Sequence, residues 1–230
     1  MKCLFQIADH DVYFFSMPVV SSNMYLIPAN GRCLVIDPAV SEQAEQLLQQ
    51  CRTEQCTILL THEHFDHISG VNRFKELFEC QVICSQTCAE RIEDSRKNAA
   101  AYFQAMFFER EKDIRRYIAQ TVDADYVCHA DMVYKGQMEL KWEDLTIRLT
   151  EAPGHSPGSQ IFETGEHWYF TGDSWIPRRE VITRLPGGSK KIYEKCTLPY
   201  LEHIDPESII FPGHGEACIY VDRNDGGRHI

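Results

Sequence analysis

Apolar residues recur along this chain in short runs that predict β-strands, and most of the runs end in a polar or glycine-rich turn. In the first half, the predicted strands cover residues 25–28, 33–37, 56–60 and 81–84. In the second half, they cover residues 138–142, 145–151, 160–163, 168–171 and 208–211. The order of these elements suggests two similar halves, although the sequence contains no close internal repeat.

Helical periodicity separates some of these strands. Ser41 is a suitable N-cap for a helix whose first turn carries Glu42. Residues 70–78 place Val71, Phe74 and Leu77 at helical spacing, which predicts a helix directly after the strand at 56–60 and its polar turn. The stretch 85–125 has no Pro or Gly and is rich in Ala, Glu, Arg and Gln, so it predicts an insertion of one or two helices.

The insertion carries an aromatic and basic stripe that allows three interpretations. It includes Phe103, Met106, Phe107 and Phe108 beside several arginines. The insertion is a lid over a binding site, a homodimer surface, or a segment whose apolar stripe simply packs onto the body. Its arginines are more typical of a solvated face than of an anion-binding clamp.

Residues 61–67 read Thr-His-Glu-His-Phe-Asp-His and follow the apolar strand at 56–60. The run offers four candidate metal ligands, His62, His64, Asp66 and His67. In an extended strand His67 would face away from the other three, whereas a loop or helix start would turn all four toward one point. Imidazole and carboxylate ligands suit zinc, iron or manganese.

Three further candidate ligands stand alone in glycine-rich turns, each after a predicted strand. They are His155 in Pro-Gly-His-Ser-Pro-Gly, Asp173 in Thr-Gly-Asp-Ser, and His214 in Pro-Gly-His-Gly. Tight turns at strand ends hold side chains rigidly and leave them open to substrate. Seven ligands are enough for two metal ions that share one carboxylate, whereas a structural zinc needs only four.

With these motifs in this order, residues 21–215 resemble the metallo-β-lactamase-fold hydrolases, and most closely their glyoxalase II-like branch. The Leu185-Pro186-Gly187-Gly188 stretch is similar to one found in that branch. The resemblance implies an α/β fold, a four-layer αββα sandwich with the helical insertion at 85–125. It implies His62, His64 and His155 on a first metal, Asp66, His67 and His214 on a second, and Asp173 bridging both. Val35-Ile36-Asp37-Pro38 resembles the family's acidic turn below the site.

Composition limits the classes of protein that fit. A chain of 230 residues with 43% hydrophobic residues predicts one domain over residues 1–221, followed by a flexible tail at 222–230. The net charge of −11 argues against nucleic acid as a partner, and no apolar stretch or signal peptide indicates membrane insertion or export. We therefore expect a cytoplasmic protein whose ten cysteines are free thiols.

The ligand set predicts a metal-dependent hydrolase. Two divalent ions, with zinc favoured over iron or manganese, would lower the pKa of a bridging water, and the resulting hydroxide would attack the substrate. Asp66 and Asp173 would orient this hydroxide and shuttle its proton. The metal charge also makes a small anionic substrate compatible with an acidic protein. Ser156 and Ser174 follow ligands, where a serine more often stabilises its turn than supports the metal.

The substrate is less constrained, because the chain departs from glyoxalase II. The third motif continues after His155 as Ser-Pro-Gly-Ser where that enzyme typically ends in Gly-His, and residues 174–179 replace an apolar pair. Fifteen residues after Gly215 are too few for a glutathione-binding helical domain. We expect a small ester, thioester or lactone. Arg178 and Arg179 are candidates to meet an anionic substrate tail, or are simply solvated.

Two alternatives remain open. A mononuclear-iron persulfide dioxygenase would use the equivalents of only His62, His155 and Asp173. A non-catalytic binding protein on the same fold would be expected to have lost ligands, and this chain retains all seven. A flavodiiron reductase is not supported. It normally carries Glu at the position of His64 and needs a flavin domain, and both are missing here.

Overall fold

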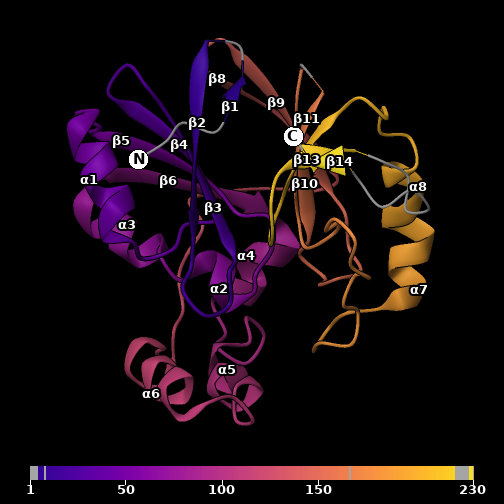
Figure 1. Ribbon diagram of the computed structural model, residues 1–230. Helices are drawn as coiled ribbons and strands as arrows, with labels where there is room; N and C mark the ends of the chain where they lie inside the picture. Colours follow the sequence, from indigo (N-terminus) through magenta and orange to yellow (C-terminus); the bar gives the residue numbers. More distant parts are fainter. Residues whose placement is uncertain (1–4, 8, 166, 221–227, 230) are drawn as a thin grey trace.

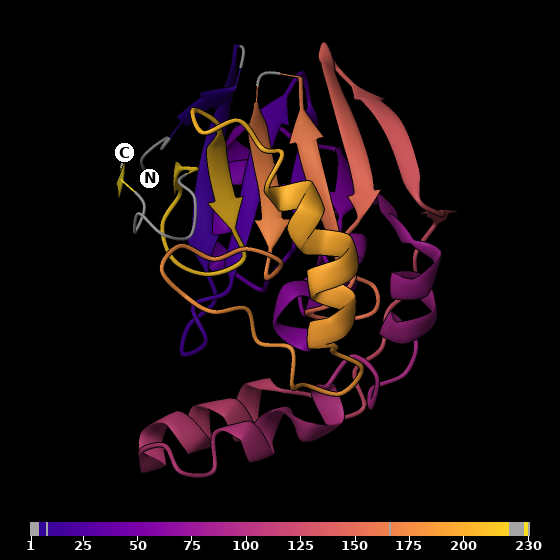
Figure 2. The same cartoon turned by 90° about the vertical axis from the view of Figure 1, so that its right-hand side faces the viewer.

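The computed structural model describes residues 5–7, 9–165, 167–220 and 228–229. Within them, two β-sheets pack face to face and helices lie on the outer face of each sheet (Figure 1). The view turned by 90° shows the C-terminal helix lying across its sheet (Figure 2). The layers therefore run helix, sheet, sheet, helix, which confirms the α/β class and the four-layer αββα sandwich.

The N-terminal sheet has the strand order β1-β2-β3-β4-β5-β6-β7. Its strands are β1 Phe5–Ile7, β2 His10–Ser16, β3 Asn23–Ala29, β4 Arg32–Ile36, β5 Gln55–Leu59, β6 Glu79–Ser85 and β7 Met132–Tyr134. The strands β1 to β4 pair antiparallel, whereas β4 to β7 pair parallel. The parallel part places the ends of β4, β5 and β6 at one edge of the sheet, and the Thr61–His67 run begins there.

Alternation along the strands divides the core between two faces. Met24 and Leu26 of β3 pack under the helices, while Tyr25 and Ile27 face the second sheet. Both faces of this sheet are covered, so its strands read as nearly continuous apolar runs. The helices that cover the outer face include α1 Glu42–Gln50 and α3 Val71–Leu77. As predicted, Ser41 caps α1, with its Oγ accepting a hydrogen bond from Ala44 N at 3.3 Å.

The C-terminal sheet has the strand order β14-β13-β12-β11-β10-β9-β8. Its strands are β8 Gln137–Trp142, β9 Leu145–Glu151, β10 Gln160–Thr164, β11 Trp168–Gly172, β12 Ile209–Pro212, β13 Cys218–Ile219 and β14 Arg228–His229. The strands β11 and β12 pair parallel, and every other pair in this sheet is antiparallel. The strands β9, β11 and β12 consequently point the same way and end at the same edge.

One helical segment covers the outer face of this sheet. It consists of α7 Lys190–Ile192, the π-helix η1 Tyr193–Thr197 and α8 Leu198–Leu201. Tyr193 and Leu201 pack with Ile161, Tyr169 and Ile210 of the strands. The sequence pattern did not reveal this segment, because only two of its side chains belong to the buried cluster and Pro199 lies inside it.

The insertion at 85–125 contains three helices, so the expectation of one or two was wrong. They are α4 Gln86–Ile92, α5 Ala100–Met106 and α6 Lys112–Thr121. The helix α4 packs on β6 as part of the body, whereas α5 and α6 project from it (Figures 1 and 2). The break between α4 and α5 needs no Pro or Gly, because Asn98 bonds Ile92 O, Tyr126 O and Ala100 N, and Ala99 adopts a φ of +69°.

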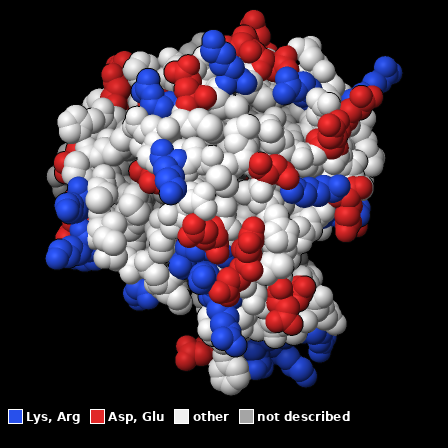
Figure 3. Space-filling view, turned by 180° about the vertical axis from the view of Figure 1, so that it is seen from behind, with Lys and Arg blue, Asp and Glu red and all other residues white. Residues whose placement is uncertain are grey.

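The helices α5 and α6 and the turn between them, residues 100–121, form a segment that we call the protrusion. The apolar residues of its stripe have two roles. Phe103 is buried and its ring lies 5.0 Å from that of Phe65 in the body. Phe108 is 73% exposed, and Tyr102 and Met106 are also exposed. Seen from behind, Lys and Arg side chains gather at the end of the protrusion with acidic groups among them (Figure 3). Its arginines are solvent-exposed, as a solvated face requires.

The structure contains several strands that the sequence pattern did not predict, and it describes only part of the C-terminal tail. The strands β1, β2, β7, β13 and β14 were not predicted. All of them except β2 have only two or three residues, whereas β2 has seven and lies between β1 and β3. Of the predicted flexible tail, residues 222–227 and 230 lie outside the described residues, whereas Arg228–His229 pair with β13. The nine cysteines in the described ranges are free thiols. No helix within those ranges has the length and apolar character needed to cross a bilayer.

Candidate metal centre

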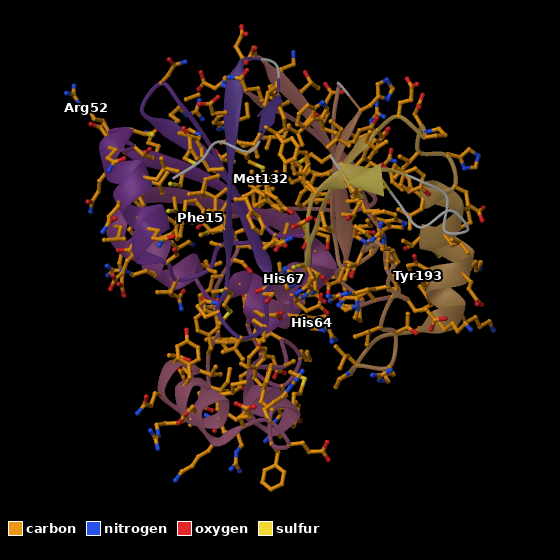
Figure 4. The ribbon with its side chains drawn as sticks, viewed as in Figure 1. Phe15, Arg52, His64, His67, Met132 and Tyr193 are labelled. Atoms are coloured by element: carbon orange, nitrogen blue, oxygen red, sulfur yellow. The ribbon has the colours of Figure 1, made fainter. Side chains whose placement is uncertain are left out.

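All seven candidate ligands meet at one edge of the sandwich, where β5, β9, β11 and β12 end. The helix α2 Phe65–Ile68 begins directly after His64, so its first turn carries Asp66 and His67 back toward the strand ends. Figure 4 shows His64 and His67 at this lower edge, between the protrusion and the helical segment that carries Tyr193. A loop and a helix start, rather than an extended strand, thus turn the Thr61–His67 run inward.

Three imidazoles form a first group of possible ligands, composed of His62, His64 and His155. One ligand atom from each lies within 4.8 Å of the others, and all three side chains are buried. His155 Nδ1 donates to Ile182 O at 2.8 Å, which leaves Nε2 unprotonated toward the group and 3.0 Å from His64 Nδ1. The hydrogen-bond network thereby selects the tautomer of His155 that a metal requires.

The hydrogen bonds of Thr61 determine the tautomer of His62 in the same way. Thr61 Oγ1 donates to Asp37 at 2.5 Å, so the contact of 3.1 Å between Thr61 Oγ1 and His62 Nδ1 is donated by the imidazole. His62 Nε2 is then an acceptor, and it is buried without a hydrogen-bond partner among the described residues. Burial lowers the pKa of His62 and of His64 well below the usual value, and neighbouring imidazoles lower it further. Both rings are therefore neutral near pH 7, as ligands must be.

A carboxylate and two imidazoles form the second group, composed of Asp66, His67 and His214. Asp66 Oδ2 lies 3.6 Å from the Nε2 atoms of both histidines, and these two nitrogens are 3.4 Å apart. His67 Nδ1 lies 2.9 Å from Asp37 Oδ2, so the imidazole donates there and turns Nε2 toward the group. This group is more open to solvent than the first, since Asp66 and His214 are partly exposed.

Asp173 lies between the two groups. Its Oδ2 is 3.6 Å from His155 Nε2 and 3.4 Å from His214 Nε2, and its Oδ1 is 3.6 Å from His67 Nε2. Burial raises the pKa of Asp173, but the neighbouring imidazoles of His214, His155 and His67 outweigh this effect and hold it well below its usual range. The carboxylate is thus ionised and within reach of both groups, as a shared ligand would be.

Asp37 supports the centre from below, at the acidic turn expected there. It is buried and accepts hydrogen bonds from Thr61 N at 2.6 Å, from Thr61 Oγ1 and from His67 Nδ1. Burial raises the pKa of Asp37, while the hydrogen bonds and charge of His67 and the bonds from Thr61 act in the opposite direction. One carboxylate therefore orients ligands of both groups, because Thr61 also fixes the His62 tautomer.

The residues present fit divalent cations. Two ligand atoms, His62 Nε2 and Asp173 Oδ1, are buried without a hydrogen-bond partner in the described structure. A buried polar atom left unpaired costs about 1–3 kcal/mol, and a cation at each group would remove this cost. The donors are nitrogen and oxygen without thiolate, which suits zinc, iron or manganese and does not choose between them.

Sequence reasoning missed some residues that shape the centre. Glu63 is fully buried and bonds the turn that carries His155. Asn23 Nδ2 donates to Pro212 O and to Gly215 O, both at 2.8 Å, and so fixes the turn of His214. A charged residue between two candidate ligands, as in His-Glu-His, was the available signal for Glu63. No comparable signal pointed to a contact between Asn23 and a turn about 190 residues later.

The remaining candidates lie outside the two groups. Ser156 Oγ donates to Glu63 at 2.7 Å, so this serine supports the ligand turn. Ser174 Oγ lies 3.4 Å from Ala152 O, while Ser174 O accepts from Tyr193 Oη at 2.9 Å. Arg178 and Arg179 are exposed. Of the histidines outside the motifs, His10 contacts Asp144, and His129 contacts Glu93.

The two packed sheets and the His/Asp cluster at their common edge define a fold class associated with metal-dependent hydrolysis. The family model of the metallo-beta-lactamase superfamily matches residues 17–214, and the chain belongs to this superfamily. Membership supports a metal-dependent hydrolase in general, with divalent metal ions as the usual cofactors of the superfamily.

Relatives among known proteins agree with this assignment. The chain is 26% identical over 219 residues to a probable metallo-hydrolase, YqgX, of Bacillus subtilis, covering 91% of this chain and 93% of the relative. It is also 26% identical over 208 residues to a hydroxyacylglutathione hydrolase of Bdellovibrio bacteriovorus, covering 86% of this chain and 65% of that enzyme. Low-identity similarity to hydroxyacylglutathione hydrolases agrees with the glyoxalase II-like resemblance of the motifs.

Solved structures share the fold. The BLEG-1 B3 metallo-beta-lactamase superposes with a TM-score of 0.72 at 22% identity, covering 90% of this chain and 92% of the other. The protein TTHA1623 in a di-iron-bound form superposes with a TM-score of 0.70 at 24% identity, covering 90% and 94%. At these identities the likeness establishes the fold alone.

Proposed function

We propose that this protein hydrolyses small esters, thioesters or lactones and that it works with two divalent metal ions, zinc being the first choice. The observation that carries the proposal is the position of Asp173, whose two oxygens lie 3.4–3.6 Å from nitrogens of both ligand groups. His62, His64 and His155 would hold one ion, Asp66, His67 and His214 the other, and Asp173 would bind both.

The chain's own residues supply orientation and proton transfer. Divalent ions, when bound, polarise a substrate carbonyl and lower the pKa of water toward neutrality. The carboxylates of Asp66 and Asp173 are 14% and 12% exposed, so they can contact both a water molecule and the bound ions. We assign these two residues to orienting the attacking water and receiving its proton, as general bases do. No Ser or Cys nucleophile is required.

The substrate class follows from the site and from the relatives together. A centre of this kind acts on carbonyl carbon through Lewis acidity, so esters, thioesters and lactones are equally suitable in chemical terms. The activity named for the Bdellovibrio relative, hydroxyacylglutathione hydrolysis, supports a thioester. The di-iron form of TTHA1623 supports iron as the alternative to zinc. We propose a small-molecule substrate and not a nucleic acid.

Metal analysis and a substrate panel test the proposal. Protein purified without added metal should contain about two metal ions per chain. Thioesters, lactones, phosphodiesters and β-lactams should be compared, with hydrolysis expected for the first two classes. The substitution Asp66→Ala should lower kcat by at least about a hundredfold, because it removes a ligand and the proton acceptor. Asp113→Ala, an exposed carboxylate on α6, is the matched control and should leave kcat unchanged.

Specific results would overturn the proposal. One iron per chain together with sulfite release from a persulfide would identify a dioxygenase instead. Absence of turnover across the whole panel would favour a binding protein on this fold. Turnover that survives Asp66→Ala unchanged would remove this residue from the mechanism.

A further inference from the structure

Glu63 is a buried charge in the middle of the ligand run, between His62 and His64. It is 0% exposed, and a carboxylate removed from water needs compensating partners. Arg91 Nε donates to Oε1, while Ser156 Oγ at 2.7 Å and Gly158 N at 3.2 Å donate to Oε2. None of these partners is one of the seven candidate ligands. Glu63 therefore contacts the segments that carry the ligands and not the ligand side chains themselves.

Through Ser156, the carboxylate joins two separate ligand segments. Ser156 follows His155 directly, and Glu63 is flanked by His62 and His64. The turn is stiffened further by Ser159 Oγ, which lies 2.8 Å from Ser156 Oγ and accepts from Ser156 N at 3.1 Å. One buried carboxylate therefore connects the backbone of all three imidazoles in the first group.

Arg91, near the end of α4, connects Glu63 to two further segments of the chain. Besides its ion pair with Glu63, its Nη2 donates to Lys97 O and to Pro186 O, both at 3.2 Å. Lys97 precedes the break that leads into the protrusion. Pro186 belongs to the Leu-Pro-Gly-Gly stretch, which follows Ile182, the backbone acceptor of His155. The planar guanidinium can make these contacts at once, which a lysine ammonium cannot reproduce.

Two glycines leave room for this ion pair. A Cβ at Gly158 would lie 2.6 Å from Glu63 Oε2, and a Cβ at Gly187 would lie 2.7 Å from Arg91 Nη2. Gly187 also has a φ of +92°, a conformation that favours glycine. Close packing around both charged groups indicates that the pair occupies a site shaped for it.

We propose that Arg91 and Glu63 are positioning residues of the metal centre. The pair sets the directions of His62, His64 and His155 and thereby the cation affinity of this group. It has much less effect on the group of Asp66, His67 and His214, which is held by Asp37 instead. The inference rests on the proposed function, because it takes the imidazoles as metal ligands.

Cobalt(II) titration of the metal-free protein tests the proposal, with visible absorption and a competing chelator as readouts. His64→Ala identifies the equivalent of cobalt that belongs to the three-imidazole group. Arg91→Met should weaken this equivalent about 10- to 100-fold, the range for residues that orient ligands, and change its spectrum. The second equivalent should stay within about twofold of the parent. Arg91→Lys keeps the charge but not the geometry, so it should weaken the first equivalent by a smaller factor.

Arg73→Met is the matched control, because Arg73 bonds both oxygens of Glu45 at 3.0 Å on the outer surface of the body. It should leave both cobalt affinities unchanged. Parent-like affinities and spectra in both Arg91 variants, with any loss confined to stability, would overturn the proposal. Should Arg91→Met fail to fold, the result with Arg91→Lys decides alone.

The test separates this inference from the proposed function. A parent protein that binds two cobalt ions but hydrolyses nothing defeats the proposed hydrolase, while the comparison of affinities still decides the role of Arg91. A parent that binds no cobalt at the three imidazoles overturns the positioning role as well.

Discussion

The metal-centre edge and the protrusion differ in how firmly each is held. At the edge, Asp37 alone accepts three hydrogen bonds, and Glu63 accepts three more. The protrusion contacts the body through a small apolar cluster around Phe65 and Phe103, and it leaves Phe108, Met106 and Tyr102 exposed. Buried hydrogen bonds allow little displacement, whereas a small apolar contact permits local opening.

This difference matches the accuracy that a metal centre requires. The ligands must be oriented accurately, so they lie on turns supported by buried polar groups. A surface that meets variable substrates or a second subunit has no such requirement. We expect substitutions at the edge to change metal binding and substitutions in the protrusion to change stability or KM.

The largest expected effect on metal binding comes from Asp37→Asn. The amide places an N–H group where His67 Nδ1 and Thr61 Oγ1 now donate, so His67 is forced toward the tautomer that carries its proton on Nε2. Affinity of the group of Asp66, His67 and His214 should fall about 10- to 100-fold in a chelator competition. Asp131→Asn is the control, since Asp131 accepts from Val82 N at 2.8 Å away from the centre. Equal metal affinity in both variants would contradict the role given to Asp37.

Phe103→Ala should have no effect on metal binding, because its consequences are confined to the other region. Removing this buried ring takes away the main contact between the protrusion and Phe65, and the free energy of unfolding should fall by about 3 kcal/mol. Hydrogen exchange should accelerate in α5 and α6, while cobalt affinity stays at the parent value. Met106→Ala, at an exposed position of the same helix, should reproduce neither change. Loss of cobalt binding in Phe103→Ala would show that the two regions are coupled.

Phe108→Ser should have the smallest effect on stability, within about 0.5 kcal/mol, because the ring is exposed. If the protrusion acts as a lid, KM should rise about two- to fivefold at unchanged metal content, the equivalent of one lost apolar contact. An unchanged KM accompanied by a later elution in size-exclusion chromatography would assign Phe108 to a subunit interface instead.

Sequence patterns located much of the fold because local physics decides it. The helix α1 begins where Ser41 can cap it, and β5 leads into the ligand run as the apolar pattern predicted. Patterns failed where an element depends on distant partners. The strand β7 exists because β6 offers it an edge, and α4 ends where Asn98 bonds the backbone of Ile92 and Tyr126.

The sequence by itself determined the set of seven candidate ligands, because residue type and position at strand ends are both local properties. The family resemblance implied how these ligands divide into two groups around Asp173. Only the tertiary structure brings them together, because the four turns that carry them lie far apart in the sequence and meet at one edge. It also decided which imidazole nitrogens face inward, through Thr61, Ile182 and Asp37. Finally, only the tertiary structure shows that Glu63, which separates two histidines in the sequence, is a buried charge paired with Arg91. Burial and ion pairing exist only in the folded chain.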